Sequence, residues 1–141
     1  MQQQFTLEDL TTETLLQLVC DEGYTAHIDD TRVVLFHGEV VLIDPCPDQR
    51  TLHLRIPLWF KARHLDALKF CNRINRKAVM IRASLPPERD AQRDWCLVLD
   101  REIPLLPGQT IAREDLLSLL RLFIEFGNDD ILDYDTGGLL D

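Results

Sequence analysis

Histidine and cysteine are the residue types in this chain that most often take part in metal or acid–base chemistry, and here they are scattered. They stand at His27, His37, His53, His64, Cys20, Cys46, Cys71 and Cys96. The cysteines lie about 25 residues apart without a C-x-x-C pair, whereas structural zinc sites take paired ligands a few residues apart. Folding could still bring strand histidines together. A small metal- or thiol-dependent sensor or enzyme using these His and Cys residues is therefore the alternative interpretation.

Motifs for covalent or phosphate chemistry are missing from the sequence. Neither serine sits in a G-x-S-x-G elbow, and the sequence contains no G-x-x-x-x-G-K-[ST] or G-x-G-x-x-G loop. A D-T-G triplet at 135–137 falls in an acidic terminal stretch rather than in a core. We therefore expect no enzyme activity, no catalytic residue, no cofactor and no metal.

Two asparagines, Asn72 and Asn75, close an apolar helical pattern in the stretch FCNRINRKAVMIR, residues 70–82. The basic residues beside them suit the negative end of a helix dipole. One interpretation is that the asparagines hydrogen-bond to nearby backbone where the helix stops. The other is that they satisfy polar groups at a helix edge that meets a second subunit.

The composition describes a small, acidic, globular chain. With 141 residues, of which 45% are hydrophobic and 28% charged, it is long enough for one domain with a real core. The net charge of -9 argues against a phosphate-backbone binder. The sequence contains no stretch of the roughly 18 apolar residues that a membrane span needs, and its start lacks the features of a secretory signal. We expect a cytoplasmic protein that binds neither nucleic acid nor membrane.

The first half of the chain changes from a helical to an extended period. Thr6 is expected to cap a helix that runs to about Glu22. RVVLF and EVVLI, joined by His37-Gly38, predict a hairpin with positive φ at the glycine. In TLHLRIPLW, residues 51–59, apolar and polar residues alternate, which predicts a strand with one buried face.

The second half predicts a helix, two strands and a last helix. The core face of the first of these helices is expected to comprise Ala67, Phe70, Cys71, Ile74 and Ala78. AVMIRASL and DWCLVLDREIPL predict two strands joined by a polar loop at 86–93, and a helix follows at about 113–126.

The predicted order is helix, three strands, helix, two strands, helix, which is typical of an α+β fold with helices flanking an antiparallel sheet. We expect one domain over residues 1–128. The acidic C-terminal tail, residues 129–141, is expected to be mobile or to lie on a basic surface.

Apolar residues exceed what helices on one side of a sheet would obviously cover. The first hairpin is apolar on both faces, and the last helix is apolar over about 220° of its wheel. Uncovered apolar surface marks an interface, so we expect a symmetric homodimer formed through the second helix or the outer sheet face. The candidate interface residues are Leu65, Leu68, Asn72, Asn75, Leu117, Phe126, Trp59 and Arg55.

Several of these features together resemble the YbjN family of bacterial proteins, labelled candidate sensory transduction regulators, whose domain is similar to type III secretion chaperones. They are the first helix ending at DEGY, the hairpin glycine in LFHGEV, the CNRINRK asparagine pair followed at once by a strand, and REIPLLPGQTIAREDLLSLLRLFI. The resemblance covers about residues 6–126. It implies a protein-interaction module, commonly a homodimer, without agreed catalytic residues. Secretion chaperones of similar shape hold extended client segments on apolar patches.

The residue patterns and the resemblance lead to one functional expectation. It is a non-enzymatic, chaperone-like or regulatory module that binds a protein partner through apolar sheet or helix surfaces. Charge adds a detail, because residues 55–113 carry 12 basic and 6 acidic groups between two acidic ends. This basic middle either neutralises the ends within the chain or offers a groove to an acidic peptide or a neighbouring subunit.

Overall fold

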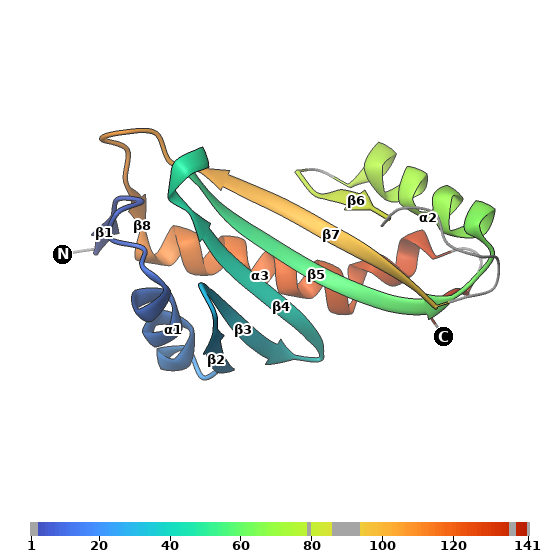
Figure 1. Cartoon of the computed structure of the whole chain (residues 1–141), viewed down its shortest axis with the longest axis horizontal. Coiled ribbons are helices and arrows are strands. Elements are labelled where there is room, and N and C mark those ends of the chain that lie inside the picture. The colour runs from blue at the N-terminus through green and yellow to red at the C-terminus, as the bar shows by residue number, and fades with distance from the viewer. Residues whose placement is uncertain (1–2, 79, 86–93, 136–137, 141) are drawn as a thin grey trace.

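The computed structural model describes residues 3–78, 80–85, 94–135 and 138–140, apart from the side chains of residues 61 and 94–96. The elements are β1 (Gln4–Phe5), α1 (Thr12–Asp21), β2 (Thr25–Asp29), β3 (Arg32–His37), β4 (Glu39–Cys46), the 3-10 helix η1 (Pro47–Gln49), β5 (Thr51–Lys61), α2 (His64–Lys77), β6 (Arg82–Ser84), β7 (Asp94–Pro104), β8 (Ile111–Ala112), α3 (Arg113–Asn128) and the 3-10 helix η2 (Asp130–Tyr134) (Figure 1). The loop expected at 86–93 and most of the D-T-G triplet lie outside the described residues.

Six strands form one antiparallel sheet in the order β2-β3-β4-β5-β7-β6, and β1 pairs with β8 in a separate two-stranded sheet. The centre of the large sheet is the ribbon of β5 and β7. These strands are 11 residues long and pair from Thr51–Pro104 to Lys61–Asp94. The architecture is therefore α+β, as the sequence predicts.

Alternation along β5 divides the large sheet into two faces. Leu52, Leu54, Ile56, Leu58 and Phe60 are all buried. The residues between them point to the opposite side, where Trp59 is 66% exposed. We call the side of Leu52 the inner face and the side of Trp59 the outer face.

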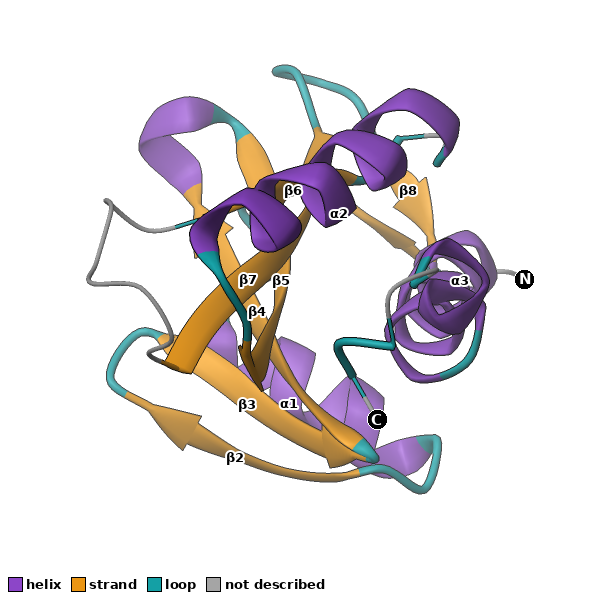
Figure 2. Cartoon of the chain, turned by 90° about the vertical axis from the view of Figure 1, so that its right-hand side faces the viewer, coloured by secondary structure: helices purple, strands orange, loops and turns teal. Residues whose placement is uncertain are grey.

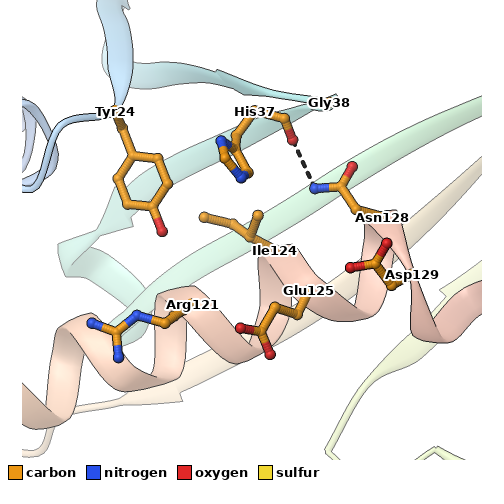
Figure 3. Close-up of a pocket in the computed structure, with 8 residues that line it drawn as sticks. All are labelled: Tyr24, His37, Gly38, Arg121, Ile124, Glu125, Asn128 and Asp129. Carbon is orange, nitrogen blue, oxygen red and sulfur yellow. Dashed lines mark hydrogen bonds between the residues drawn. The ribbon is translucent and has the colours of Figure 1, made fainter.

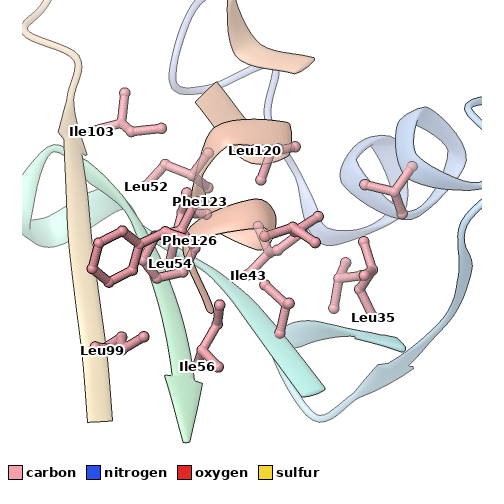
Figure 4. Packing of buried hydrophobic residues seen from close by; sticks show 14 of the residues in the cluster. Leu35, Ile43, Leu52, Leu54, Ile56, Leu99, Ile103, Leu120, Phe123 and Phe126 are labelled. Atoms are coloured by element: carbon pink, nitrogen blue, oxygen red, sulfur yellow. The ribbon is translucent and has the colours of Figure 1, made fainter. Parts of the chain in front are cut away.

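The three helices pack on the inner face (Figure 2). The ring of Phe70 in α2 lies 6.2 Å from that of Phe60 in β5. Gly127 in α3 lies so close to Ile56 that a Cβ added there would come within 2.5 Å of Ile56 Cδ1. α1 contacts β2, β3 and β4. Figure 4 shows the resulting core, in which leucine and isoleucine side chains of the strands meet the phenylalanines of α3.

The order of elements corrects the prediction. Thr25–Asp29 forms a strand, β2, so four strands rather than three follow the first helix. The prediction missed it because TAHID, residues 25–29, is short and carries only two apolar residues, so its alternation stands out little beside the longer apolar runs that follow. β6 is also shorter than expected, since only 82–84 pair with β7.

The first helix begins at Thr12, capped by Thr11, instead of at Thr6. Thr11 Oγ1 accepts a hydrogen bond from Thr14 N at 3.2 Å. Thr6 does form a capping-type turn, because Thr6 N donates to Asp9 Oδ2 at 2.8 Å and Asp9 N donates to Thr6 Oγ1 at 3.3 Å. Two similar capping sequences follow one another here, and only the second continues into a helix.

Part of the acidic tail lies on the domain. η2 buries Ile131 and contacts both α2 and α3. Arg73 Nε donates to the backbone oxygen of Tyr134 at 2.8 Å, and the Tyr134 ring lies 5.5 Å from that of Phe126. This segment thus rests against the basic end of α2, one of the two placements expected from the sequence.

Candidate interaction surface

The outer face of the large sheet is a candidate interaction surface, because no helix in the described part of the chain packs on it (Figure 2). Residues that oppose one another in an antiparallel ladder share a face, so the register defines its membership. Its apolar members are Val34, Phe36, Val40, Leu42, Pro57, Trp59 and Val98. Its polar members include Asp44, His53, Arg55, Arg82, Asp100 and Glu102.

Aromatic side chains dominate the apolar end of the outer face. Trp59 is 66% exposed and Phe36 is 45% exposed. The ring of Phe36 lies 5.4 Å from the ring of His27 on β2. Exposed tryptophan and phenylalanine offer large, rigid contact areas, which is the property of residues that dominate binding energy at interfaces.

Charged pairs cross the strands at the other end of the outer face. Arg55 Nη2 lies 3.3 Å from Asp44 Oδ2, and His53 Nε2 contacts Asp100 Oδ1. The Arg55 side chain is not fully satisfied, since its Nε is buried without a hydrogen-bond partner among the described residues. The face therefore combines an aromatic end for burial with a polar end that can fix orientation.

A second exposed surface lies on α2. Leu65 is 57% exposed and Leu68 is 38% exposed, and Asn72, one turn further on, is exposed as well. The side chain of Asn72 makes no hydrogen bond within the described part of the chain. These three residues point away from the core face of the helix, so the structure separates them from Trp59 and Arg55 on the outer sheet face.

Asn75 closes the edge of the sheet at β6, an arrangement we call the edge clasp. Its Nδ2 donates to Ala83 O at 3.0 Å, and its Oδ1 accepts from Ala83 N at 2.7 Å. The side-chain amide thus takes the place that a neighbouring strand would fill. For Asn75 the interpretation of local backbone hydrogen bonding is correct.

Leu117 and Phe126 lie in the core, which corrects their expected place at an interface. Leu117 is 3% exposed and Phe126 is 7% exposed. The helical wheel indicated surplus apolar surface because it took no account of η2, which covers Phe126 with Tyr134. Leu122 is the α3 leucine that remains largely exposed, at 58%.

Asn128 fixes the β3–β4 hairpin through a second pair of side-chain hydrogen bonds, and we call this arrangement the hairpin clasp. Its Nδ2 donates to His37 O at 2.7 Å and its Oδ1 accepts from Glu39 N at 3.0 Å (Figure 3). Gly38 between them has φ +72, and a Cβ there would lie 2.4 Å from the amide oxygen. The sequence predicted the glycine conformation but missed its partner, which is 91 residues away from His37.

A cavity of about 490 Å³ lies beside the hairpin clasp (Figure 3). The rings of Tyr24 and His37 form one wall, edge to face at 5.4 Å. The other wall is formed by α3 with Arg121 and Glu125, and by Asp129 directly after the helix. Its charges are of both signs, so the lining does not select one ligand class.

The histidines and cysteines are the residues on which the alternative interpretation, a metal- or thiol-dependent sensor or enzyme, depends. Within the described residues, no group of three or more His, Cys, Asp or Glu side chains is placed to hold a metal ion. Burial raises the pKa of the Cys71 thiol to about 11, and burial also raises the pKa of Cys46. Both thiols are therefore less reactive than a free cysteine.

The arrangement defines an α+β domain whose antiparallel sheet has helices on one face and an open, partly aromatic surface on the other. No family model matches the chain, and no curated protein matches it. The fold is similar to that in the crystal structure of YbjN, a candidate transcription regulator from E. coli. The TM-score is 0.69, and the match covers 92% of this chain and 94% of that chain. At 19% identity this similarity establishes a YbjN-like fold, as the sequence resemblance predicts.

None of the helices in the described ranges is long and apolar enough to cross a bilayer.

Proposed function

We propose that the chain is a non-enzymatic, regulatory or chaperone-like module that binds a protein partner through the outer face of its sheet. The observation that carries this proposal is the exposure of Trp59 and Phe36 on a sheet face that the described helices leave open. We also propose that the protein works in the cytoplasm as a homodimer and binds neither nucleic acid nor membrane.

The chemistry of the outer face indicates what the partner presents. Trp59 and Phe36 favour an apolar segment, while the Asp44–Arg55 and His53–Asp100 pairs favour polar groups at its other end. An extended segment that lies across the strands would meet both ends. The sequence resemblance to a family whose domain is similar to secretion chaperones implies such binding of extended segments on apolar patches, and the YbjN-like fold is compatible with it.

The proposal is tested with a matched pair of variants. Trp59→Glu places a charge at the aromatic end of the outer face, and Leu122→Glu places one at a comparably exposed site on α3. The tagged proteins are recovered from their own host in mild salt, and bound proteins are quantified by mass spectrometry. The partner is then purified and titrated against each variant by calorimetry.

We expect one partner to be recovered with the wild-type chain and with Leu122→Glu but not with Trp59→Glu. Loss of an interface tryptophan commonly costs about 2 kcal/mol or more, which corresponds to roughly 30-fold in affinity. The proposal is wrong if the two variants bind the partner equally well. Repeated recovery of the chain alone would also count against it and would return attention to a self-contained sensor.

A further inference from the structure

The two edges of the large sheet are treated differently. At β6 the edge clasp occupies the outward N–H and C=O groups of Ala83, at 2.7 and 3.0 Å. At the opposite edge, β2 pairs only with β3 within the described part of the chain. β2 lies at the lower margin of the molecule in both views, with α1 beside it (Figures 1 and 2). An unpaired edge is a template for pairing with another strand.

The register identifies the backbone groups that β2 presents. Two residues, 30–31, turn the chain from β2 into β3, and the strands pair in register from Asp29–Arg32 onward. A two-residue turn makes its flanking pair a hydrogen-bonded pair, and bonded and non-bonded pairs then alternate. Ala26 and Ile28 fall on non-bonded pairs, so their N–H and C=O groups point to the free edge.

We propose that two copies of the chain join edge to edge through β2, antiparallel and related by a two-fold axis at His27. In this register Ala26 of each copy faces Ile28 of the other, and Thr25 faces Asp29. The outward N–H and C=O groups of Ala26 and Ile28 then all find partners in the second copy. The result is one continuous sheet with the helices of both copies on the same side.

A second copy suits this edge because β2 is complementary to itself in that register. Asp29 meets a neutral threonine rather than another carboxylate, and Ile28, which is 38% exposed, is covered by an alanine. Only His27, on the axis, faces the same residue of the second copy. β2 also contains no proline, lysine or bulge, the devices that usually prevent pairing at an exposed edge.

This inference deepens the proposed homodimer and rests on that part of the proposed function. It replaces the second helix and the outer face, which the sequence favoured, with the β2 edge as the place where the copies meet. It leaves Trp59 and Phe36 free for a partner.

The first test removes one outward hydrogen-bond donor. Ile28→Pro deletes an N–H that makes no bond to β3, a position where an edge strand tolerates proline. We expect sedimentation equilibrium to show a dimer at least tenfold weaker than the wild type, with circular dichroism unchanged. Ile28→Val, the matched control, keeps the N–H and should keep the dimer.

The second test measures the register itself, and it decides the question if the proline variant fails to fold. On the axis, His27 and its copy form a non-bonded pair with Cα atoms about 4.5 Å apart, within the range of a disulfide. The two Thr25 residues would lie roughly 13 Å apart along the strands, too far for a disulfide. In a background with Cys20→Ser and Cys46→Ser, His27→Cys should give a covalent dimer on mild oxidation and Thr25→Cys should not.

Several outcomes would overturn the inference. A dimer unaffected by Ile28→Pro, or equal crosslinking of Thr25→Cys and His27→Cys, removes the β2 edge as the contact. If the dimer survives Ile28→Pro but is lost on Leu65→Glu, the copies join through α2. That result refutes the β2 edge and keeps the proposed homodimer. A chain that is monomeric at every concentration refutes both the inference and the dimer, while partner binding at Trp59 is judged separately.

Discussion

The two asparagines near the end of α2 should differ sharply in their effect on stability. Replacing Asn75 by alanine removes the side-chain hydrogen-bond partners of both the N–H and the C=O of Ala83, a residue that is only 4% exposed. An unsatisfied buried backbone group costs about 1–3 kcal/mol, and the low end applies here because the Asn75 side chain is exposed and water can reach the site. Two such groups give about 2 kcal/mol.

Helix propensity offsets a small part of this loss of stability. Alanine is a better helix former than asparagine by roughly 0.5 kcal/mol, so Asn75→Ala should destabilise the fold by about 1.5 kcal/mol. Asn72→Ala gains the same propensity and loses no hydrogen bond within the described chain. It should be neutral or stabilising by up to about 0.5 kcal/mol. The two variants should therefore differ by about 2 kcal/mol.

Equilibrium unfolding in urea measures this difference, provided that the slope against denaturant is the same for both variants. Hydrogen exchange gives a local check, because the Ala83 amide should lose protection in Asn75→Ala and keep it in Asn72→Ala. A difference below about 0.5 kcal/mol would refute the edge clasp as a source of stability. An unchanged exchange rate at Ala83 would show that its amide has another partner.

Three further predictions concern close packing and burial. Gly127→Ala should destabilise the fold because its Cβ would lie 2.5 Å from Ile56 Cδ1. Ile56→Val removes that carbon and should relieve the clash, so a double-mutant cycle measured by urea unfolding should give a coupling energy above about 1 kcal/mol. Gly38→Ala should reduce the free energy of unfolding by about 2 kcal/mol or more and so lower the melting temperature. The reason is that φ is +72 and the new Cβ would lie 2.4 Å from the amide oxygen of the hairpin clasp. The pKa of Cys71 is raised from 9.0 to about 11, so its contribution to stability is present below pH 9 and is lost as the pH rises through 11. Alkylation at pH 8 should accordingly modify the exposed Cys20 and spare Cys71 until the chain unfolds.

Periodicity predicted those parts of the fold that one element determines by itself. The alternation along β5 correctly indicated which face is buried, and the 3.6-residue pattern correctly placed Phe70 and Ile74 on the core face of α2. Both follow from the geometry of a single strand or helix against one apolar layer. The outer face was also indicated in part, since Trp59 fell on the exposed side of the alternation.

Contacts between distant segments were beyond the reach of such patterns. The wheel of α3 indicated an uncovered Phe126, but η2 folds back over that helix and buries it. The hairpin clasp joins Asn128 to a turn 91 residues earlier, and no local signal marks an asparagine as the partner of a distant hairpin. Asn75 resembled Asn72 in sequence, and only the position of β6 distinguishes them.

The β2 edge and the outer face, if both proposals hold, act together in a way that can be measured. Opposed residues of an antiparallel pair share a face, so joining two copies at β2 places both outer faces on the same side of one sheet. Phe36 pairs with Thr25 of its own copy and stands one strand in from the axis. The two Phe36 residues would therefore be separated by roughly 14 Å across the sheet, which is three strand spacings, and by roughly 13 Å along it, or about 19 Å in all. A partner segment long enough to reach both would bind with the advantage of a linked, two-site contact.

Ile28→Pro should then weaken partner binding although residue 28 is not on the outer face. We expect at least a tenfold loss of apparent affinity for the partner in calorimetry, with the stoichiometry changing from one partner per two chains to one per chain. Trp59→Glu should abolish binding without dissociating the dimer. If Ile28→Pro separates the copies and each still binds the partner as tightly as before, the outer faces work independently and the dimer serves another purpose.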